Sequence, residues 1–128
     1  MDGKPRPTHI DLGERVLNMD YDTSYVEQHF INQSEVIYDD GSNKIEKTGL
    51  PPEQLIDTYR LHVDHQINLQ NHGNVSMFNL VEGSSCVVEV GSYQLDVHYA
   101  ETFIVPAAVE HFTIRCTEPV KLMRAQIR

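Results

Sequence analysis

The residues from Phe78 to His111 constrain the fold more than any other part of the sequence. Within this stretch, short apolar runs are separated by the pair Glu82-Gly83, the pair Gly91-Ser92 and a lone proline, Pro106. Each run is short for a helix but long enough for a β-strand. Many short strands at such close spacing are typical of sandwiches and barrels. The sequence therefore predicts an all-β jelly-roll barrel.

The strand pattern begins at residue 34. A turn at Asp39–Asn43 separates Val36–Tyr38 from Lys44–Glu46, which predicts a hairpin. Thr58–Asp64 alternates strictly, with Tyr59, Leu61 and Val63 on one face. We expect the remaining strands at Gln66–Leu69, Val75–Val81 (largely apolar, as for a strand buried in a sandwich), Ser85–Val90, Tyr93–Val97, Thr102–Val105, Glu110–Cys116 and Val120–Ile127.

The N-terminal residues differ from this pattern. Residues 1–20 are predicted to be a linker followed by a short helix, and residues 21–128 a single β-domain. Thr8 and Asp11 have capping-box spacing, which predicts a helix over His9–Asn18 with Ile10, Val16 and Leu17 as apolar anchors. A helix this short is below the ~12–15 residues needed for marginal stability in water, so its apolar side must pack on something. Residues 19–33 fit either a helical turn or a loop.

Composition limits the class of protein. With 128 residues the chain is sized for one domain, and its net charge of −9 disfavours nucleic acid and anionic membranes as partners. No apolar run reaches the ~18 residues of a membrane-spanning helix, and the N-terminus has no secretory signal pattern. We therefore predict a cytoplasmic protein in which Cys86 and Cys116, both inside predicted strands, are buried reduced thiols.

The proline and the histidine five residues after it are similar to the second signature of the cupins, G-x5-P-x-G-x2-H-x3-N. When Pro106 is aligned with this signature, His111 matches its histidine. Ala100 and Ala108 replace its two glycines, and Arg115 replaces its asparagine. The resemblance implies a cupin-type barrel.

The first cupin signature, G-x5-H-x-H-x3-E-x6-G, is matched less well. Aligned on Gly83, it places Gln70 and His72 at the two histidines and Ser76 at the glutamate. In metal-binding cupins these positions and the last histidine hold a divalent ion. Two imidazoles without a carboxylate form a poor set of ligands, so we expect no metal site. Gln70, His72 and His111 are nevertheless the candidates for any metal or ligand in the barrel.

Other arrangements give little sign of catalysis. His62 and Asp64 share a face of one predicted strand, where a hydrogen bond could poise the imidazole for acid–base chemistry, although such pairs more often lie on a solvated surface. Ser84-Ser85 lacks the G-x-S-x-G context of a serine nucleophile. We therefore predict no catalytic residue.

Several segments together resemble the C-terminal cupin domain of type I mannose-6-phosphate isomerase. They are FNLVEG at 78–83, YAETFIVPAAVEHFTI at 99–114, and Tyr59-Arg60-Leu61 ahead of them. Arg6–Asp11 is similar to the T-P-K-x-x-D-like segment that joins the family's catalytic region to its last domain. The resemblance extends over nearly the whole chain.

This resemblance implies an accessory role. In that family the zinc ligands and a catalytic arginine lie in the N-terminal catalytic cupin, before the T-P-K-x-x-D-like segment. The chain is thus expected to be a fragment, or the product of a split gene, of a larger isomerase that interconverts mannose 6-phosphate and fructose 6-phosphate. It would have no cofactor of its own, no activity alone, and the zinc-dependent catalytic domain as its partner.

Two alternatives stay open from the sequence. The chain could be a stand-alone small cupin that binds a metal or a sugar through Gln70, His72 and His111, or a pure interaction module. The N-terminal helix also predicts a weak homodimer, because its apolar face needs a partner.

Overall fold

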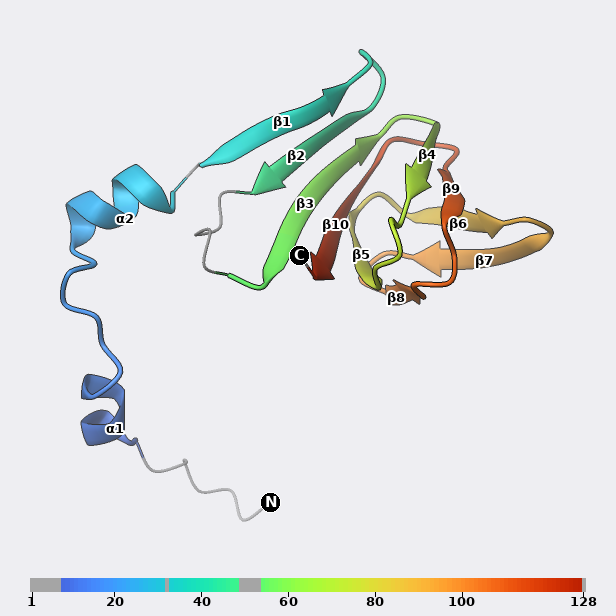
Figure 1. The fold of residues 1–128 in the computed structure, drawn as a ribbon. Helices are drawn as coiled ribbons and strands as arrows, with labels where there is room; N and C mark the ends of the chain where they lie inside the picture. Colours follow the sequence, from blue (N-terminus) through green and yellow to red (C-terminus); the bar gives the residue numbers. More distant parts are fainter. Residues whose placement is uncertain (1–7, 32, 49–53, 128) are drawn as a thin grey trace.

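Two antiparallel β-sheets and two short helices make up the computed structural model, which describes residues 8–31, 33–48 and 54–127 (Figure 1). Ten strands lie in this described part of the chain. We call the two sheets together the barrel, and residues 8–31 the N-terminal arm. The predicted all-β fold with a short N-terminal helix is confirmed.

The larger sheet has six strands. Its central strand, β10, pairs with β3 along its whole length, from Val120 opposite Val63 to Ile127 opposite Ile56. On its other side β10 pairs with β5. The spatial order is β1 (Ser34–Asp39), β2 (Lys44–Thr48), β3 (Ile56–Val63), β10 (Val120–Ile127), β5 (Ser76–Glu82) and β8 (Thr102–Val105).

The smaller sheet has four strands, in the order β4 (Gln66–Gln70), β9 (His111–Arg115), β6 (Ser85–Val90) and β7 (Tyr93–His98). The two sheets share one apolar core. At its centre the ring of Phe78 stacks on Phe103 at 5.0 Å between centroids and meets the edge of Phe112 at 5.7 Å. The alternation predicted for β3 is confirmed, because Leu61 and Val63 are buried and Tyr59 packs against the core.

Strand β5 lies within the stretch Val75–Val81 that is predicted to be a buried strand, and it alternates, with Ser76, Phe78 and Leu80 buried. Met77 and Val81 are each 43% exposed. One face of β5 is therefore buried in the core and the other is partly exposed in the described residues.

Gly83 makes the tight connection between β5 and β6. Its φ of +96° lies in the region that favours glycine. A Cβ atom at this position would lie 2.6 Å from Cγ1 of Val120 and 3.1 Å from the backbone oxygen of Pro119. The turn therefore requires glycine both for its backbone conformation and for the close approach of β10.

The two cysteines lie in the core as predicted. Cys86 and Cys116 are buried free thiols. Burial raises the pKa of Cys86 to about 11, so the thiol is protonated and unreactive at neutral pH.

The helix predicted over His9–Asn18 is shorter in the structure, where α1 spans Ile10–Glu14. Its N-cap is His9, without a side-chain capping bond, so the predicted capping box at Thr8 and Asp11 does not form. Gly13 and the lack of any surface to pack on explain the short length. Ile10, Val16 and Leu17, expected to be packed, are 70%, 84% and 64% exposed.

Within the ambiguous stretch 19–33, residues Thr23–His29 form a second helix, α2. The carboxylate of Asp22 accepts a hydrogen bond from the backbone N–H of Tyr25 at 2.8 Å and caps this helix. The ring of Tyr25 stacks on Tyr21 at 4.8 Å and meets the edge of Phe30 at 5.7 Å. Neither helix has a buried residue, and both project away from the sheets (Figure 1). No helix in the described ranges is long and apolar enough to cross a membrane.

Candidate functional site

An open cavity of about 730 Å³ is lined by residues of both sheets. The hairpin β1–β2 contributes apolar side chains to its wall, and strands β4, β9 and β10 contribute polar ones. Its lining consists of Ile37, Ile45, Asn68, Leu69, Gln70, His72, Glu89, Gly91, His111, Phe112, Thr113 and Arg124.

All three candidate residues from the sequence line this cavity, but their side chains are exposed. Gln70 and His111 are direct partners at the ends of β4 and β9. Strand alternation turns Leu69 and Phe112 into the core, so the side chains of Gln70 and His111 point the other way. His72 follows in a turn with φ of +51°. The three residues therefore lie at the rim of a cavity and not inside the barrel, where the sequence placed them.

These residues do not fit a metal site. Their donor set is two imidazoles and one amide, without a carboxylate, whereas divalent ions in proteins favour three histidines or histidines with a carboxylate. In the described residues, no group of three or more histidine, cysteine, aspartate or glutamate side chains could hold a metal ion.

The inward-facing residues nearby form a neutral polar network. The side chain of Asn71 is buried and donates to the backbone oxygen of Pro106 at 2.9 Å. The hydroxyl of Ser76, which stands at the glutamate position of the cupin signature, donates to Oδ1 of Asn71 at 2.6 Å. Nε2 of Gln126 donates to the backbone oxygen of Asn71 at 2.9 Å. The network fixes the ends of β4, β5 and β10 against one another.

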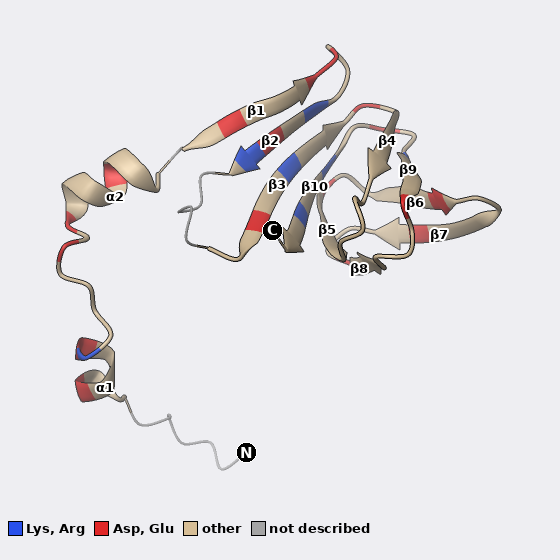
Figure 2. Cartoon of the chain, in the orientation of Figure 1, with Lys and Arg blue, Asp and Glu red and all other residues tan. Residues whose placement is uncertain are grey.

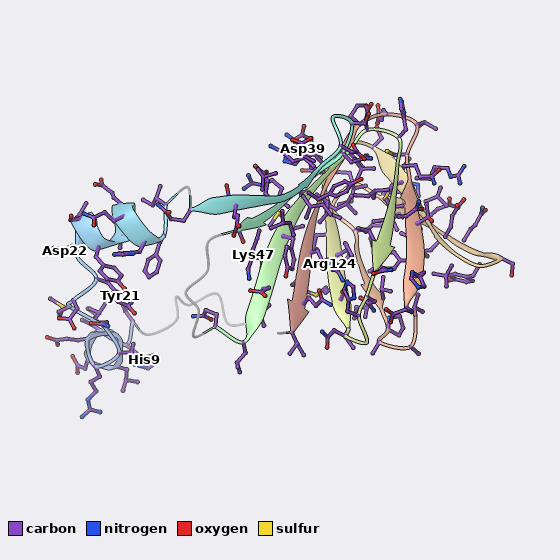
Figure 3. All side chains as sticks on the ribbon, turned by 45° about the horizontal axis from the view of Figure 1, so that its top comes forward. His9, Tyr21, Asp22, Asp39, Lys47 and Arg124 are labelled. Carbon is purple, nitrogen blue, oxygen red and sulfur yellow. The ribbon has the colours of Figure 1, made fainter. Side chains whose placement is uncertain are left out.

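A guanidinium group completes this network. Arg124 extends from β10 toward the end of β4 and the start of β5 (Figure 3). Its Nε and Nη2 donate to the hydroxyl oxygen of Ser76 at 3.0 and 2.9 Å. Nη2 also donates to the backbone oxygen of Gln70 at 3.1 Å and to Oδ1 of Asn71 at 3.3 Å.

Aromatic rings support the same group. The guanidinium carbon of Arg124 lies 5.5 Å from the ring centroid of Phe78 and 6.0 Å from that of Tyr59. Burial lowers the pKa of Arg124 from its ordinary value. An arginine nevertheless keeps its charge at neutral pH. A fixed positive charge thus lies beside the position that is glutamate in the cupin signature.

Arg124 was missed by the sequence interpretation, although a signal was present. Val120 and Leu122 are buried on β10. A period of two then places Arg124 and Gln126 on the same inner face. An arginine on the inner face of a barrel strand is unusual enough to mark a site.

The hydrogen bond that the sequence allows between His62 and Asp64 is not formed, in keeping with the solvated surface that such pairs more often occupy. Instead, Nε2 of His62 lies 2.9 Å from Oε2 of Glu46 on the neighbouring strand β2. Lys44 also donates to Oε1 of Glu46 at 3.0 Å. The hydrogen bonds from Lys44 and then His62 hold the pKa of Glu46 below its usual value. Basic and acidic positions are interspersed on β2 and β3 (Figure 2), so this cluster is a network of surface ion pairs.

Ala100 agrees with the match to the second cupin signature. It stands at the first glycine of that signature and has φ of +66°, a conformation that glycine adopts more easily. Its N–H donates to the backbone oxygen of Leu80 at 2.9 Å, which holds the turn between β7 and β8 against β5.

Comparison with solved structures identifies the architecture. Mannose 6-phosphate isomerase from Bacillus subtilis is similar with a TM-score of 0.74 and 15% identity, over 98% of this chain and 36% of that one. An RmlC-like cupin from Shewanella frigidimarina has a TM-score of 0.59 and 17% identity, over 77% of this chain and 86% of that one. The cupin domain of Schizosaccharomyces pombe Cnp3 has a TM-score of 0.56 and 16% identity, over 66% of this chain and 64% of that one.

The fold is a cupin jelly roll. At such identities these likenesses show the fold alone. No protein-family model matches the sequence, and no curated protein matches it either. The cupins from Shewanella and Schizosaccharomyces leave about a quarter to a third of this chain unmatched. The Bacillus isomerase leaves almost none unmatched, although this chain spans only about a third of its length.

Proposed function

We propose that this chain is a non-catalytic accessory cupin domain of a sugar-phosphate isomerase similar to mannose-6-phosphate isomerase. It would brace a zinc-dependent catalytic domain that interconverts mannose 6-phosphate and fructose 6-phosphate. The observation that carries the proposal is the match to the Bacillus isomerase over 98% of this chain, which includes the N-terminal arm. The cupins from Shewanella and Schizosaccharomyces match only 77% and 66% of this chain.

The arm has the properties of a docking segment. It carries many large apolar side chains, and none of the residues in its helices is buried. Helices of five and seven residues are too short to persist in water without a partner. The exposed apolar residues of the arm are Ile10, Leu12, Val16, Leu17, Met19, Tyr21, Tyr25 and Ile31.

Strand β1 extends this surface. It follows α2 in the chain and forms the outer edge of the larger sheet (Figure 1). All six of its residues are exposed, including Val36, Ile37 and Tyr38. An exposed edge strand offers unpaired backbone groups beside its apolar side chains. The arm and β1 both expose apolar side chains, and we assign these side chains to contacts with the catalytic domain of the same isomerase.

The chemistry of the cavity supports the absence of catalysis in this domain. Its lining presents amide, imidazole and hydroxyl groups, and the one carboxylate among the described lining residues, Glu89, pairs with Arg115. Ser76, at the glutamate position of the cupin signature, instead accepts from the Arg124 guanidinium. Metal-assisted interconversion of an aldose and a ketose needs a bound metal ion and, close to it, a base that moves a proton on the sugar. The zinc and that base would come from the partner.

The test is to mix this chain with the separately produced catalytic part of a mannose-6-phosphate isomerase from the same organism, and to measure binding by calorimetry. The triple variant Leu12→Ser, Val16→Ser, Leu17→Ser should bind at least about tenfold more weakly, because it removes the apolar anchors. Tyr93→Ser is the matched control, since Tyr93 is 63% exposed on β7, far from the arm.

Two results would contradict the proposal. One is equal binding by the triple variant and the wild type. The other is zinc-dependent isomerase turnover by the chain alone that disappears in His111→Ala, which would support the stand-alone cupin.

The second candidate function, a stand-alone cupin that binds a small sugar, is favoured by one observation. Gln70, His72 and His111, drawn from two separate segments, all line the same cavity. In this function, sugar binding would occur without any partner protein and would weaken in His111→Ala.

A further inference from the structure

Arg124 carries a positive charge without a carboxylate partner. None of the ion pairs in the described residues involves Arg124, and its hydrogen bonds all go to neutral oxygens of Gln70, Asn71 and Ser76. Glu89, which also lines the cavity, is bound instead by Nη2 of Arg115 at 3.1 Å. The carboxylate in the cavity is therefore occupied by another cation.

Part of the guanidinium remains available to a ligand. Nε and Nη2 of Arg124 donate to protein oxygens, whereas Nη1 has no hydrogen-bond partner in the described residues. No buried side-chain nitrogen or oxygen in those residues lacks a partner, so Nη1 must reach solvent. Nη1 is thus at least partly exposed with its two N–H donors unused by the described residues, and Arg124 is one of the residues that line the open cavity.

The group is also held in place before any ligand arrives. Three protein oxygens fix one side of the fork, and the rings of Phe78 and Tyr59 flank the guanidinium. A ligand that uses Nη1 then does not have to immobilise a long side chain, which removes one cost of binding.

The rest of the cavity suits a small polar molecule. Thr113 donates from Oγ1 to Oδ1 of Asn68 at 2.8 Å, which leaves the amide nitrogen of Asn68 as a donor. Gln70, His72 and His111 add further polar groups at the rim. A cavity of about 730 Å³ is in the range of small-molecule sites.

We propose that this cavity binds a small polyhydroxylated molecule through its phosphate or carboxylate group, with Arg124 as the anion-binding residue. The oxyanion accepts hydrogen bonds from Nη1, and the hydroxyl groups of the molecule contact the polar rim. The site is formed by the barrel alone. This ligand class applies to the second candidate function, the stand-alone cupin. The cavity would bind the same ligands if the chain is an accessory domain.

The test is to titrate the full chain with three probes. Binding is monitored by calorimetry and by amide chemical shifts. Inorganic phosphate and gluconate present the two anions, and sorbitol is the neutral polyol control. We expect saturable millimolar binding of at least one anion, with shifts at Gln70, His72, His111 and Thr113, and no saturable binding of sorbitol. The tighter of the two anions identifies the chemical group that the site prefers.

Variants assign the binding to Arg124. Arg124→Gln should weaken anion binding at least about tenfold, because a charge-assisted hydrogen bond is lost. The matched control is Arg60→Gln, at an exposed arginine on β3 of the same sheet, and it should bind as the wild type does. If Arg124→Gln does not fold, Arg124→Lys decides, since it keeps the charge but loses the fork and should weaken binding by at least about threefold.

The proposal is overturned if neither anion binds saturably, if the shifts map elsewhere, or if the folded Arg124 variant binds as tightly as the wild type. Docking to the catalytic domain is measured in a separate experiment with arm variants, so either proposal can fail while the other stands.

Discussion

The N-terminal arm and the barrel both contain many large apolar side chains, but only the barrel buries them. Among the described residues, sixteen apolar residues form the core, and all of these lie between Leu61 and Leu122. In the arm, Val16 and Met19 are more than 80% exposed. Apolar content by itself therefore does not decide burial in this chain.

Geometry accounts for the difference. Each barrel strand presents alternate side chains to one face, and the opposite sheet covers that face. The two helices of the arm are separated by a connection and are too short to form a continuous apolar stripe that another element could cover. The barrel therefore buries its own apolar side chains, whereas the helices of the arm bury none.

The largest effect is expected in the core. Phe78→Ala removes a ring with no exposure that contacts both Phe103 and Phe112. It should lower the free energy of unfolding by about 3–5 kcal/mol, a large part of the ~5–15 kcal/mol typical of a domain. Leu17→Ala in the arm should change it by less than about 0.5 kcal/mol. Urea unfolding followed by circular dichroism measures both, and similar costs would remove the distinction between the regions.

A pair of glycine substitutions gives a smaller contrast. Gly83→Ala places a Cβ 2.6 Å from Val120 at a φ of +96°, and should cost roughly 1–3 kcal/mol of stability. Gly13→Ala meets nothing within 4 Å and favours the helical backbone of α1 by about 1 kcal/mol. Its effect should be confined to the arm. Thermal unfolding of both variants tests this, and a tolerated alanine at Gly83 would contradict the close packing of β10.

The pH dependence of stability should be affected by a charge in the barrel. The pKa of Glu46 is lower in the folded chain than its ordinary 4.5, so the unfolded chain binds more protons in this range. Stability from Glu46 is therefore present above that value and is lost as the pH falls through the folded pKa. Glu46→Gln should cost up to about 1 kcal/mol at neutral pH and flatten the acid limb of the stability curve.

The matched control for this change is Glu14→Gln in the arm, an exposed carboxylate without an ion pair in the described residues. It should leave the acid limb unchanged. A wild-type acid limb in the Glu46→Gln protein would show that the contacts of Glu46 with Lys44 and His62 do not stabilise the fold.

The smallest effect is expected from deletion of residues 1–18. Helix α1 buries no residue, so the free energy of unfolding of the barrel should change by less than about 0.5 kcal/mol. Light scattering on the wild-type chain and on the deletion variant tests the predicted weak homodimer. The deletion variant should be a monomer. A fall in melting temperature without a change in mass would instead show that the arm folds back on the barrel.

The sequence by itself determined where the strands and turns lie. The alternation around Tyr59, Leu61 and Val63, the turn at Gly83 and the buried thiols all follow from local pattern and residue chemistry. These features depend on neighbours along the chain, so a single sequence contains the information. Ser76, which the sequence aligns with the glutamate of the cupin signature, is buried.

Only the tertiary structure decided which side chains meet. His62 pairs with Glu46 and not with Asp64, because β2 lies beside β3 and brings the carboxylate within 2.9 Å. Gln70 and His111 point outward because the sheets bury Leu69 and Phe112 instead. A period of two defines two faces of a strand but does not say which one the opposite sheet covers.

Arg124 shows most clearly that local sequence patterns do not predict contacts between distant segments. Its place on the inner face follows from the alternation of β10, but its partners lie about fifty residues away along the chain, at Gln70, Asn71 and Ser76. A guanidinium is tolerated there because those strands present oxygens to it at the same point. That convergence depends on sheet pairing between distant segments, which local sequence patterns do not encode.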